Sequence, residues 1–355
     1  MGNAMKIMFI IDHFGNGGAE RVVSLLTDET VRLGHETYVV VNFDERQYEL
    51  NPGIHYVVTE CRHNQSALRK MDRLLSLRRT IRQVKPDAIF SFGYFMNLYS
   101  IAACLGLRGR RLIISERTDP NSEPGSAAMR RLRNLIYRGC DLLVCQTDDA
   151  RDYFAAALRK KAVVIPNPIK AGLPRRDPAR VSRTIVNACR LEDQKTLPLL
   201  IDAFQEVHAR YPEYSLVIYG DGTRREQLER QIDALGLQDC VSLPGFQRGL
   251  HELMKDCALF ASSSDYEGIS NSMLEAMGMG MPVVCTDCPI GGASMVIRNG
   301  ENGLLTPVGD RAALRDAVLR LIEHPQEAET LGKNALQVNE QFAVSRIVKA
   351  WLDLC

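Results

Sequence analysis

Short apolar runs alternate with longer amphipathic segments along nearly the whole chain. Apolar runs rich in Val, Ile and Leu are typical of strands buried on both faces of a sheet, and segments with helical spacing are typical of the helices that cover it. The alternation therefore predicts an α/β chain with parallel sheets. The expected strands are residues 6–11, 38–42, 88–92, 111–115, 142–146, 162–165, 184–188, 215–219, 241–243, 259–262, 282–285 and 304–306. The helices expected among the first six strands, and at the end of the chain, are residues 19–33, 68–84, 96–105, 127–138, 149–158 and 345–354.

A polar stretch that begins with two prolines divides these strands into two sets. Pro166 and Pro168 follow the sixth strand, and mostly polar residues continue to Arg183. Two sets predict two Rossmann-like, doubly wound domains, with a ligand-binding cleft between them at the carboxyl ends of the strands. We expect the domains over residues 1–168 and 169–344, followed by a final helix over 345–355. Residues 1–4 are interpreted as a remnant of cloning before a native start at Met5.

Composition excludes several classes of protein. The chain has 44 basic and 43 acidic residues, a balance that argues against a general nucleic-acid binder. Its ten cysteines include one Cys-x-x-Cys pair, Cys285 with Cys288, which favours reduced cytosolic thiols over a zinc or redox site. All apolar runs are far shorter than the ~20 residues of a membrane span. We therefore expect a cytoplasmic protein whose contact with a membrane, if any, is peripheral at its inner face.

Two glutamates, Glu267 and Glu275, lie eight residues apart around a Gly-Ile-Ser-Asn-Ser turn. A helix that starts near Ile269 would direct its free backbone N–H groups at an anion. Upstream, Arg190 follows an expected strand, and Lys195 comes five residues later. Two such cations can neutralise a diphosphate leaving group without a metal ion. These residues suit a nucleotide-sugar diphosphate, with one carboxylate near the ribose and the other near the sugar.

With these residues in place, the chain resembles the retaining GT-B glycosyltransferases of the large family 4, which includes sucrose synthases and bacterial mannosyl and GalNAc transferases. The resemblance covers nearly the whole chain and implies the GT-B fold. It also implies that the final helix packs back on the first domain. The segments that carry it are Gly17-Gly18-Ala19-Glu20-Arg21, Ser115 to Pro120, Ile165-Pro166-Asn167-Pro168, Arg190 with Lys195, Tyr219-Gly220-Asp221-Gly222, Pro244-Gly245-Phe246, Glu267 with Glu275, and Asn302-Gly303-Leu304-Leu305.

The resemblance implies roles in binding the donor. Arg190 and Lys195 would hold the diphosphate, Glu267 would lie near the donor sugar, and Glu275 would bind the ribose 2′ and 3′ hydroxyls. For the side chains of Ser270, Asn271 and Ser272, capping of the helix is the alternative interpretation. The other residues expected at the donor are Gly17, Gly18, Phe246, Gly268, Ile269, Ser270, Asn271 and Ser272.

The turn that contains Gly17 and Gly18 has two interpretations. Glu20 stands where a nicotinamide-binding G-x-G-x-x-G motif needs its last glycine, so that motif is excluded. A tight strand-to-helix turn remains one interpretation. The match to the glycosyltransferase pattern favours the other, in which the backbone contacts the donor phosphate or sugar.

Acceptor binding is assigned to the first domain. Glu116, Arg117 and Asp119 follow a strand that should face the cleft. Many relatives have histidine at the position of Arg117, so the role of that histidine near the reacting sugar does not transfer to this chain. For Arg117, a structural ion pair is the alternative to binding a ligand. Arg78 and Arg82 belong to a basic amphipathic helix, and residues 129–138 form a second one. Such helices can rest on anionic lipid or grip the pyrophosphate of a polyprenyl carrier, or can be ordinary solvated faces.

The resemblance thus implies a retaining, metal-independent transferase without a cofactor. We expect a UDP-sugar donor, with UDP-GalNAc or UDP-GlcNAc favoured, and a glycan acceptor linked to polyprenyl diphosphate, in the synthesis of bacterial surface polysaccharide or glycoconjugate. Two alternatives stay open: a non-hydrolysing UDP-sugar epimerase of the same architecture, and a non-catalytic subunit that binds a nucleotide-sugar.

Overall fold

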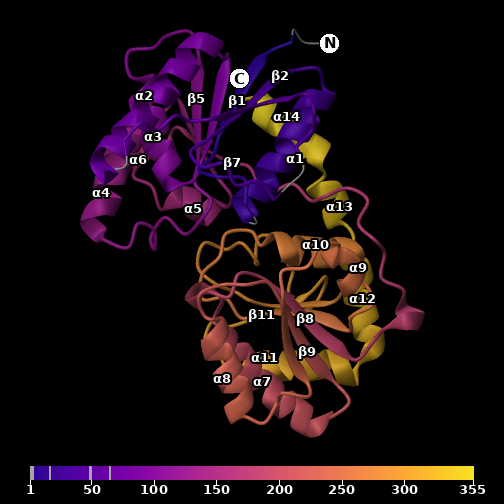
Figure 1. Cartoon of the computed structure of the whole chain (residues 1–355). Helices are drawn as coiled ribbons and strands as arrows, with labels where there is room; N and C mark the ends of the chain where they lie inside the picture. Colours follow the sequence, from indigo (N-terminus) through magenta and orange to yellow (C-terminus); the bar gives the residue numbers. More distant parts are fainter. Residues whose placement is uncertain (1–3, 16, 48–49, 64) are drawn as a thin grey trace. The chain divides into compact units, whose positions relative to one another are not determined.

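The computed structural model describes residues 4–15, 17–47, 50–63 and 65–355. The chain forms two compact units, residues 1–168 together with 344–355, and residues 169–343 (Figure 1). The first three residues of the expected cloning remnant, and Asn16 of the glycine turn, lie outside the described residues. No helix in the described part of the chain is both long and apolar enough to cross a membrane.

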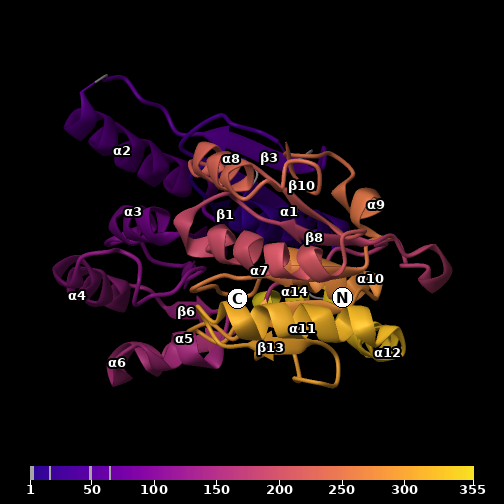
Figure 2. The same cartoon turned by 90° about the horizontal axis from the view of Figure 1, so that it is seen from below.

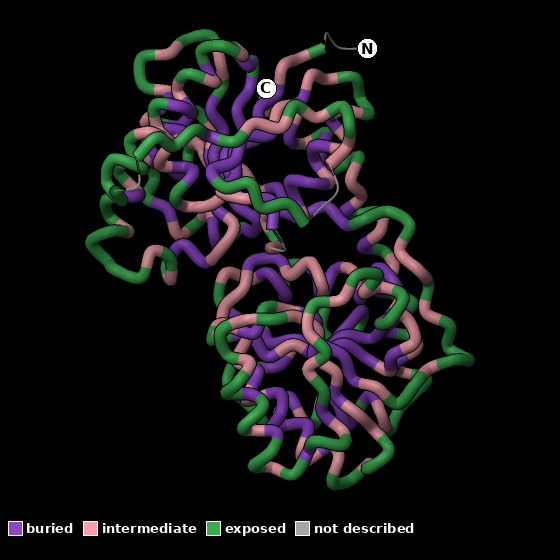
Figure 3. Tube along the Cα trace, in the orientation of Figure 1, coloured by how far each residue is buried: buried purple, intermediate pink, exposed green. Residues whose placement is uncertain are grey.

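The first unit is built on a seven-stranded parallel sheet with strand order β3-β2-β1-β4-β5-β6-β7. Its middle strands are buried on both faces, as expected for apolar runs in a parallel sheet (Figure 3). The edge strand β3 was not predicted; its residues are all intermediate or exposed, so it is not a fully buried apolar strand like the middle ones. The strands are β1 (Lys6–Ile10), β2 (Glu36–Val41), β3 (Ile54–Val58), β4 (Ala88–Phe92), β5 (Arg111–Ser115), β6 (Leu142–Cys145) and β7 (Ala162–Val164).

Seven α-helices of the described residues belong to this unit. The single helix expected over residues 149–158 is two short helices, since the chain turns between them and buries Phe154, which is 1% exposed. The last helix of the chain packs Trp351 against Phe90 and Phe92, with ring centroids 5.1 and 5.3 Å apart. The helices are α1 (Gly18–Arg32), α2 (Ser66–Val84), α3 (Tyr94–Cys104), α4 (Ala127–Ile136), α5 (Asp148–Asp152), α6 (Ala156–Arg159) and α14 (Val344–Leu352).

The second unit has a six-stranded parallel sheet with strand order β10-β9-β8-β11-β12-β13. Successive residues of a strand face opposite sides, so Ile185 joins one apolar core and Val186 joins the other. Helices α7 and α11 pack side by side over the first core (Figure 2). The strands are β8 (Thr184–Ala188), β9 (Ser215–Tyr219), β10 (Val241–Gly245), β11 (Leu259–Ser262), β12 (Val283–Thr286) and β13 (Leu304–Thr306). The helices are α7 (Leu197–Arg210), α8 (Arg225–Ala234), α9 (Leu250–Met254), α10 (Asn271–Met279), α11 (Arg311–Glu323), α12 (Pro325–Ala335) and α13 (Val338–Gln341).

Each sheet has one position where the strand order reverses direction. In the first sheet this switch lies between β1 and β4, and in the second it lies between β8 and β11. Loops that leave the carboxyl ends of two such strands diverge to opposite faces of the sheet, and ligands of doubly wound folds bind in the crevice that they leave. The loops after β8 and β11 carry Arg190, Lys195 and Glu267.

Candidate functional site

The loops after β8 and β11 hold three of the expected donor-site side chains together. The Lys195 ammonium forms an ion pair with the Glu267 carboxylate, and both side chains are mostly buried, at 13% and 21% exposed. Arg190 is exposed and makes no ion pair or side-chain hydrogen bond with any described residue. The site therefore contains one internally paired cation and one that is free to meet an anionic ligand.

Hydrogen bonds between the two loops fix this arrangement. The Asp265 amide donates to the Gln194 carbonyl at 2.9 Å, and the Gln194 side chain donates to the Tyr266 carbonyl at 2.8 Å. The Ser263 hydroxyl donates to the carbonyl of Lys195 at 2.9 Å. Since each loop satisfies polar groups of the other, the positions of Lys195 and Glu267 depend on both strands.

A third loop, after β9, binds the acidic residues that follow Arg190. The Glu192 carboxylate accepts hydrogen bonds from the Thr223 amide at 3.1 Å and its hydroxyl at 2.7 Å, and these bonds lower the pKa of Glu192. Asp193 pairs with Arg224, which lowers the pKa of Asp193. The loop after β9 thus fixes both acids: Asp193 has its ion-pair partner there, and Glu192 stays a carboxylate that Arg190 and Arg224 also favour electrostatically.

Glycines allow these loops to approach each other closely. A Cβ atom on Gly222 would lie 2.4 Å from the Leu191 carbonyl oxygen, next to Arg190 in the chain. A Cβ on Gly292 would lie 1.7 Å from the Gly268 carbonyl oxygen, directly after Glu267. Both distances are too short for any side chain, so these two glycines are required by packing on the candidate site.

Helix α10 begins at Asn271, two residues later than the expected start near Ile269. The Ser270 hydroxyl caps the helix by accepting from the Met273 amide at 3.3 Å, which fixes the start. The Ile269 side chain is 3% exposed and belongs to the apolar core, so only its backbone borders the loop. The positive end of the α10 dipole nevertheless lies in the loop that carries Glu267.

Glu275, on α10, contacts a histidine that the sequence reasoning missed. His251 Nε2 lies 2.8 Å from Glu275 Oε2, and the two side chains are 17% and 14% exposed. His251 belongs to the short helix α9, 24 residues upstream. No spacing rule links the two helices, so no sequence signal identified the pair.

Phe246, also expected at the donor, follows the edge strand β10 and is 53% exposed.

In the first unit, Gly17 caps α1 and Gly18 is its first residue. A Cβ on Gly17 would lie 2.0 Å from Glu20 Oε2, so Glu20 folds back over the amino end of its own helix. Glu20 is 9% exposed, and its Oε1 lies 3.6 Å from His13 Nδ1. The amino end of α1 therefore already faces a carboxylate, which supplies the negative charge that the helix dipole favours.

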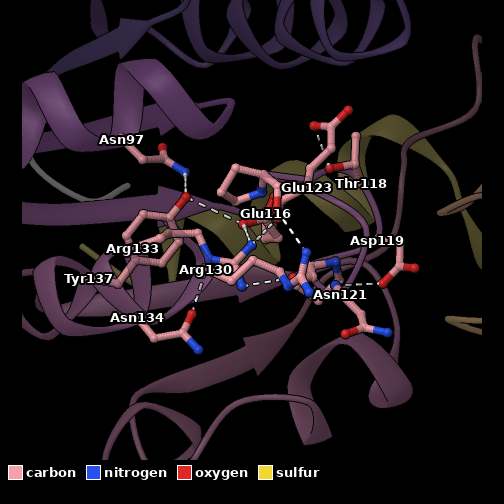
Figure 4. A network of polar contacts seen from close by, with 12 residues as sticks. Asn97, Glu116, Thr118, Asp119, Asn121, Glu123, Arg130, Arg133, Asn134 and Tyr137 are labelled. Atoms are coloured by element: carbon pink, nitrogen blue, oxygen red, sulfur yellow. Dashed lines mark hydrogen bonds and ion pairs between the residues drawn. The ribbon is translucent and has the colours of Figure 1, made fainter. Parts of the chain in front are cut away.

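Glu116, expected to bind acceptor, lies in a buried polar network (Figure 4). Its carboxylate is 3.8 Å from the Arg133 guanidinium and 3.3 Å from the Tyr137 hydroxyl. Burial raises the pKa of Glu116 to about 7, although Arg133 acts in the opposite direction. Arg133 also donates to the Pro120 carbonyl at 2.8 Å and to the Glu123 carbonyl, so it fixes the segment after β5. Asp119 accepts from the Asn121 amide within this segment at 2.8 Å.

Arg117 is held by the first unit itself. Its guanidinium donates to the Asn167 side-chain oxygen and lies 5.8 Å from the centre of the Phe92 ring. Burial lowers the pKa of Arg117 to about 9. The alternative of a structural role for the residues after β5 thus matches the contacts of Glu116, Arg117 and Asp119.

The two arginines expected on the basic helix α2 differ in their contacts. Arg78 donates to the carbonyls of Ala103 and Leu105 at 2.6 and 2.8 Å, so it satisfies the carboxyl end of α3. Arg82 is exposed to solvent.

All ten cysteines are free thiols. Within the described ranges, no three His, Cys, Asp or Glu side chains gather in an arrangement that could hold a metal ion.

Comparison with known proteins identifies the family. Residues 16–172 match the model of Glycosyltransferase Family 4, and residues 177–338 match the model of Glycosyl transferases group 1. The chain is a glycosyltransferase of this family. The two matched regions correspond to the two units, and together they cover most of the chain.

This glycosyltransferase is similar to curated proteins and to solved structures of other proteins. A Streptomyces coelicolor protein described as exopolysaccharide phosphotransferase SCO2592 is 34% identical over 60% of this chain, which spans only 23% of that relative. The Campylobacter jejuni N-acetylgalactosamine-N,N'-diacetylbacillosaminyl-diphospho-undecaprenol 4-alpha-N-acetylgalactosaminyltransferase is 28% identical over 90% of both proteins. The structure of Anabaena Alr3699/HepE in complex with UDP and glucose has a TM-score of 0.85 with 22% identity, and 98% of each chain is covered. The fold of this glycosyltransferase is GT-B, as expected.

Proposed function

We propose that this glycosyltransferase moves a sugar from a UDP-sugar to a lipid-linked glycan, with retention of configuration and without a metal ion. The observation that carries the proposal is the arrangement of Arg190, Lys195, Glu267 and the amino end of α10 in two hydrogen-bonded loops at the strand-order switch of the second sheet. The HepE structure, which contains UDP and glucose, supports a uridine nucleotide as the donor carrier.

Charge stabilisation is the task of the second unit in this proposal. As the bond between the anomeric carbon and the diphosphate oxygen breaks, negative charge grows on the diphosphate. Arg190 and the positive end of α10 stabilise that charge. A lysine ammonium has three donors, so pairing with Glu267 leaves Lys195 able to bind phosphate oxygens. The acceptor hydroxyl attacks the face that the diphosphate vacates, and its proton leaves with the departing diphosphate.

The remaining donor contacts follow from the same placement. Glu275 binds the ribose hydroxyls, and Glu267 orients Lys195 and lies near the sugar. Backbone groups of residues 268–272 contact the phosphates. Exposed Phe246 stacks on the base. Gly17 and Gly18 suit a sugar hydroxyl better than a phosphate, because the Glu20 carboxylate already lies against Gly17 and would repel an anion.

Helix α4 is the surface that we propose for a membrane-borne acceptor. Met129, Leu132 and Leu135 are 44%, 56% and 59% exposed at helical spacing, and Arg131 and Arg138 are exposed nearby. An apolar face with arginines beside it suits an anionic lipid surface, and the acceptor would then be reached at the cytoplasmic face of the membrane. The name of the Campylobacter relative, which specifies a diphospho-undecaprenol-linked acceptor, supports this class of substrate.

A donor panel tests the central proposal. Turnover is measured with UDP-, GDP- and ADP-sugars in excess chelator, with a polyprenyl-diphosphate glycan or a soluble sugar as acceptor. We expect transfer from a UDP-sugar to the lipid-linked acceptor, with the anomeric configuration of the donor retained in the product by NMR. Activity that requires added magnesium or manganese would contradict the metal-independent mechanism. Formation of an epimerised UDP-sugar without any acceptor would contradict transfer.

A vesicle-binding experiment tests the role of α4. We expect flotation with anionic vesicles at low salt, weakened as the Debye length falls from about 10 Å at 0.1 M to about 3 Å at 1 M. The double substitution Leu132→Ser with Leu135→Ser should abolish flotation, whereas Leu33→Ser, at an exposed apolar residue directly after α1, should not change it. Equal flotation of all three proteins would exclude α4 as the membrane-contacting surface.

A further inference from the structure

The contact between His251 and Glu275 joins two short helices at a place where the family resemblance assigns a role to Glu275 alone. His251 Nε2 and Glu275 Oε2 are 2.8 Å apart, within the range of a strong hydrogen bond. Since an ionised carboxylate only accepts, Nε2 carries the hydrogen and donates. Both side chains are more than four-fifths buried. The pair is therefore a defined internal contact and not a surface ion pair.

Helix α9 is itself held so that His251 stays in place. Met254 on this helix is 1% exposed and belongs to the apolar core that α10 also contacts, and Leu250 packs against that core. The acidic neighbour Glu252 lies on the exposed side of α9 and binds Lys255 at 2.7 Å. Glu252 is thus engaged elsewhere, and the imidazole of His251 hydrogen-bonds to Glu275.

A hydrogen bond to one carboxylate oxygen fixes the orientation of the whole group. A carboxylate has about four acceptor positions, so one bond from His251 is compatible with further bonds from two adjacent hydroxyls of a ligand. A carboxylate fixed in advance also loses less conformational freedom when it binds a ligand. The histidine can therefore raise affinity for a vicinal diol without touching the ligand.

We infer that His251 is a positioning residue that orients Glu275 toward the vicinal diol of a nucleotide ribose. This inference rests on the proposed function, in which Glu275 binds the ribose of UDP. It adds a residue that acts through another residue, and it predicts an effect confined to the hydroxyl groups of the ligand.

Calorimetric titration with three ligands tests the inference. UDP carries the diol, 2′,3′-dideoxy-UDP lacks it, and pyrophosphate lacks the nucleoside altogether. The wild-type protein should prefer UDP over the dideoxy analogue by about tenfold or more, the effect of hydrogen bonds to a charged group. In His251→Ala this preference should fall to about threefold or less, while pyrophosphate affinity stays within about twofold of wild type. His251→Gln, which keeps a side-chain N–H donor, should restore part of the preference.

Controls separate this role from general damage to the second unit. Glu252→Ala, on the same helix, should leave all three affinities unchanged, and a thermal melt of each variant reports whether it folds. Equal loss of UDP and pyrophosphate affinity in His251→Ala would show a merely structural residue and overturn the inference. An unchanged preference for the diol in that variant would also overturn it, with the donor assignment intact. If wild-type protein binds no UDP, the donor assignment fails, and the inference fails with it.

Discussion

Glu116 provides a prediction whose size follows from its surroundings. The carboxyl group is 3% exposed, and burial raises its pKa to about 7, against 4.5 for an ordinary glutamate. The group is therefore harder to ionise in the folded protein than in the unfolded chain. As pH rises above about 4.5, ionisation stabilises the unfolded chain first, and the free energy of unfolding falls until pH passes about 7.

The substitution Glu116→Gln removes this ionisation and keeps the shape of the side chain. Each unit of pKa difference corresponds to about 1.4 kcal/mol, so the full shift corresponds to about 3 kcal/mol at pH 8. At pH 5 most of this cost is absent, because the folded wild-type protein keeps the group protonated. The variant should therefore be more stable than wild type by under about 1 kcal/mol at pH 5 and by about 3 kcal/mol at pH 8.

The single tryptophan allows the first unit to be followed alone. Trp351 is 1% exposed and packs in the core of that unit, so its fluorescence reports local unfolding in urea or on heating. For a domain of this size, about 3 kcal/mol corresponds to roughly 6–12 °C in melting temperature. Comparing variant with wild type at each pH cancels the titration of all other groups.

The opposite result would refute the reasoning directly. If Glu116→Gln is less stable than wild type at pH 8, the folded protein stabilises the ionised carboxylate relative to the unfolded chain, and the attraction of Arg133, which lies 3.8 Å away, outweighs the cost of burial. Glu45→Gln serves as the control, because Glu45 is an exposed acid of the same unit. Its stability difference from wild type should not change between pH 5 and pH 8.

Further predictions concern the second unit. Arg190→Ala should lower turnover by on the order of a hundredfold through lost charge stabilisation, while Arg248→Ala, at another exposed arginine, should not; equal rates for both would remove Arg190 from the mechanism. Gly292→Ala should lower turnover or stability because its Cβ would meet the Gly268 carbonyl oxygen at 1.7 Å, whereas Gly125→Ala, with open space around it, should be neutral in a melt and a rate assay. An unaffected Gly292→Ala enzyme would show that this close approach does not position the Glu267 loop.

The fold could be predicted largely from the sequence because buried parallel strands are short, apolar and β-branched. Six strands, including β4 and β8, begin and end at the expected residues. The family resemblance placed Arg190, Lys195 and Glu267 at one donor site, and these residues follow strands whose carboxyl ends share one edge of the sheet. The edge strand β3 lacks the continuous apolar run that made the others recognisable.

Contacts between side chains from distant elements could not be predicted in the same way. Arg78 lies on a basic helix, but its partners are carbonyl groups at the end of another helix, and those are not visible in a residue pattern. Arg133 donates to a carbonyl in the loop before its own helix, and His251 contacts a glutamate on another helix. No fixed sequence spacing relates either pair of residues. The structure therefore changes the interpretation of Glu116 and Arg78 more than that of Arg190.

Helix α14 makes the first unit discontinuous in the sequence. Ile169 and Ala343, the ends of the second unit, form a parallel bridge, so the whole second unit is an insertion within the first. During synthesis on the ribosome, the residues from Ile169 to Ala343 take roughly 10–35 s to be made before α14 emerges. Throughout that interval α14 has not been made, so Trp351 cannot yet cover the surface of Phe90 and Phe92 that it packs against in the finished protein. Premature termination in the last ten or so codons should therefore damage the half of the protein that was translated first.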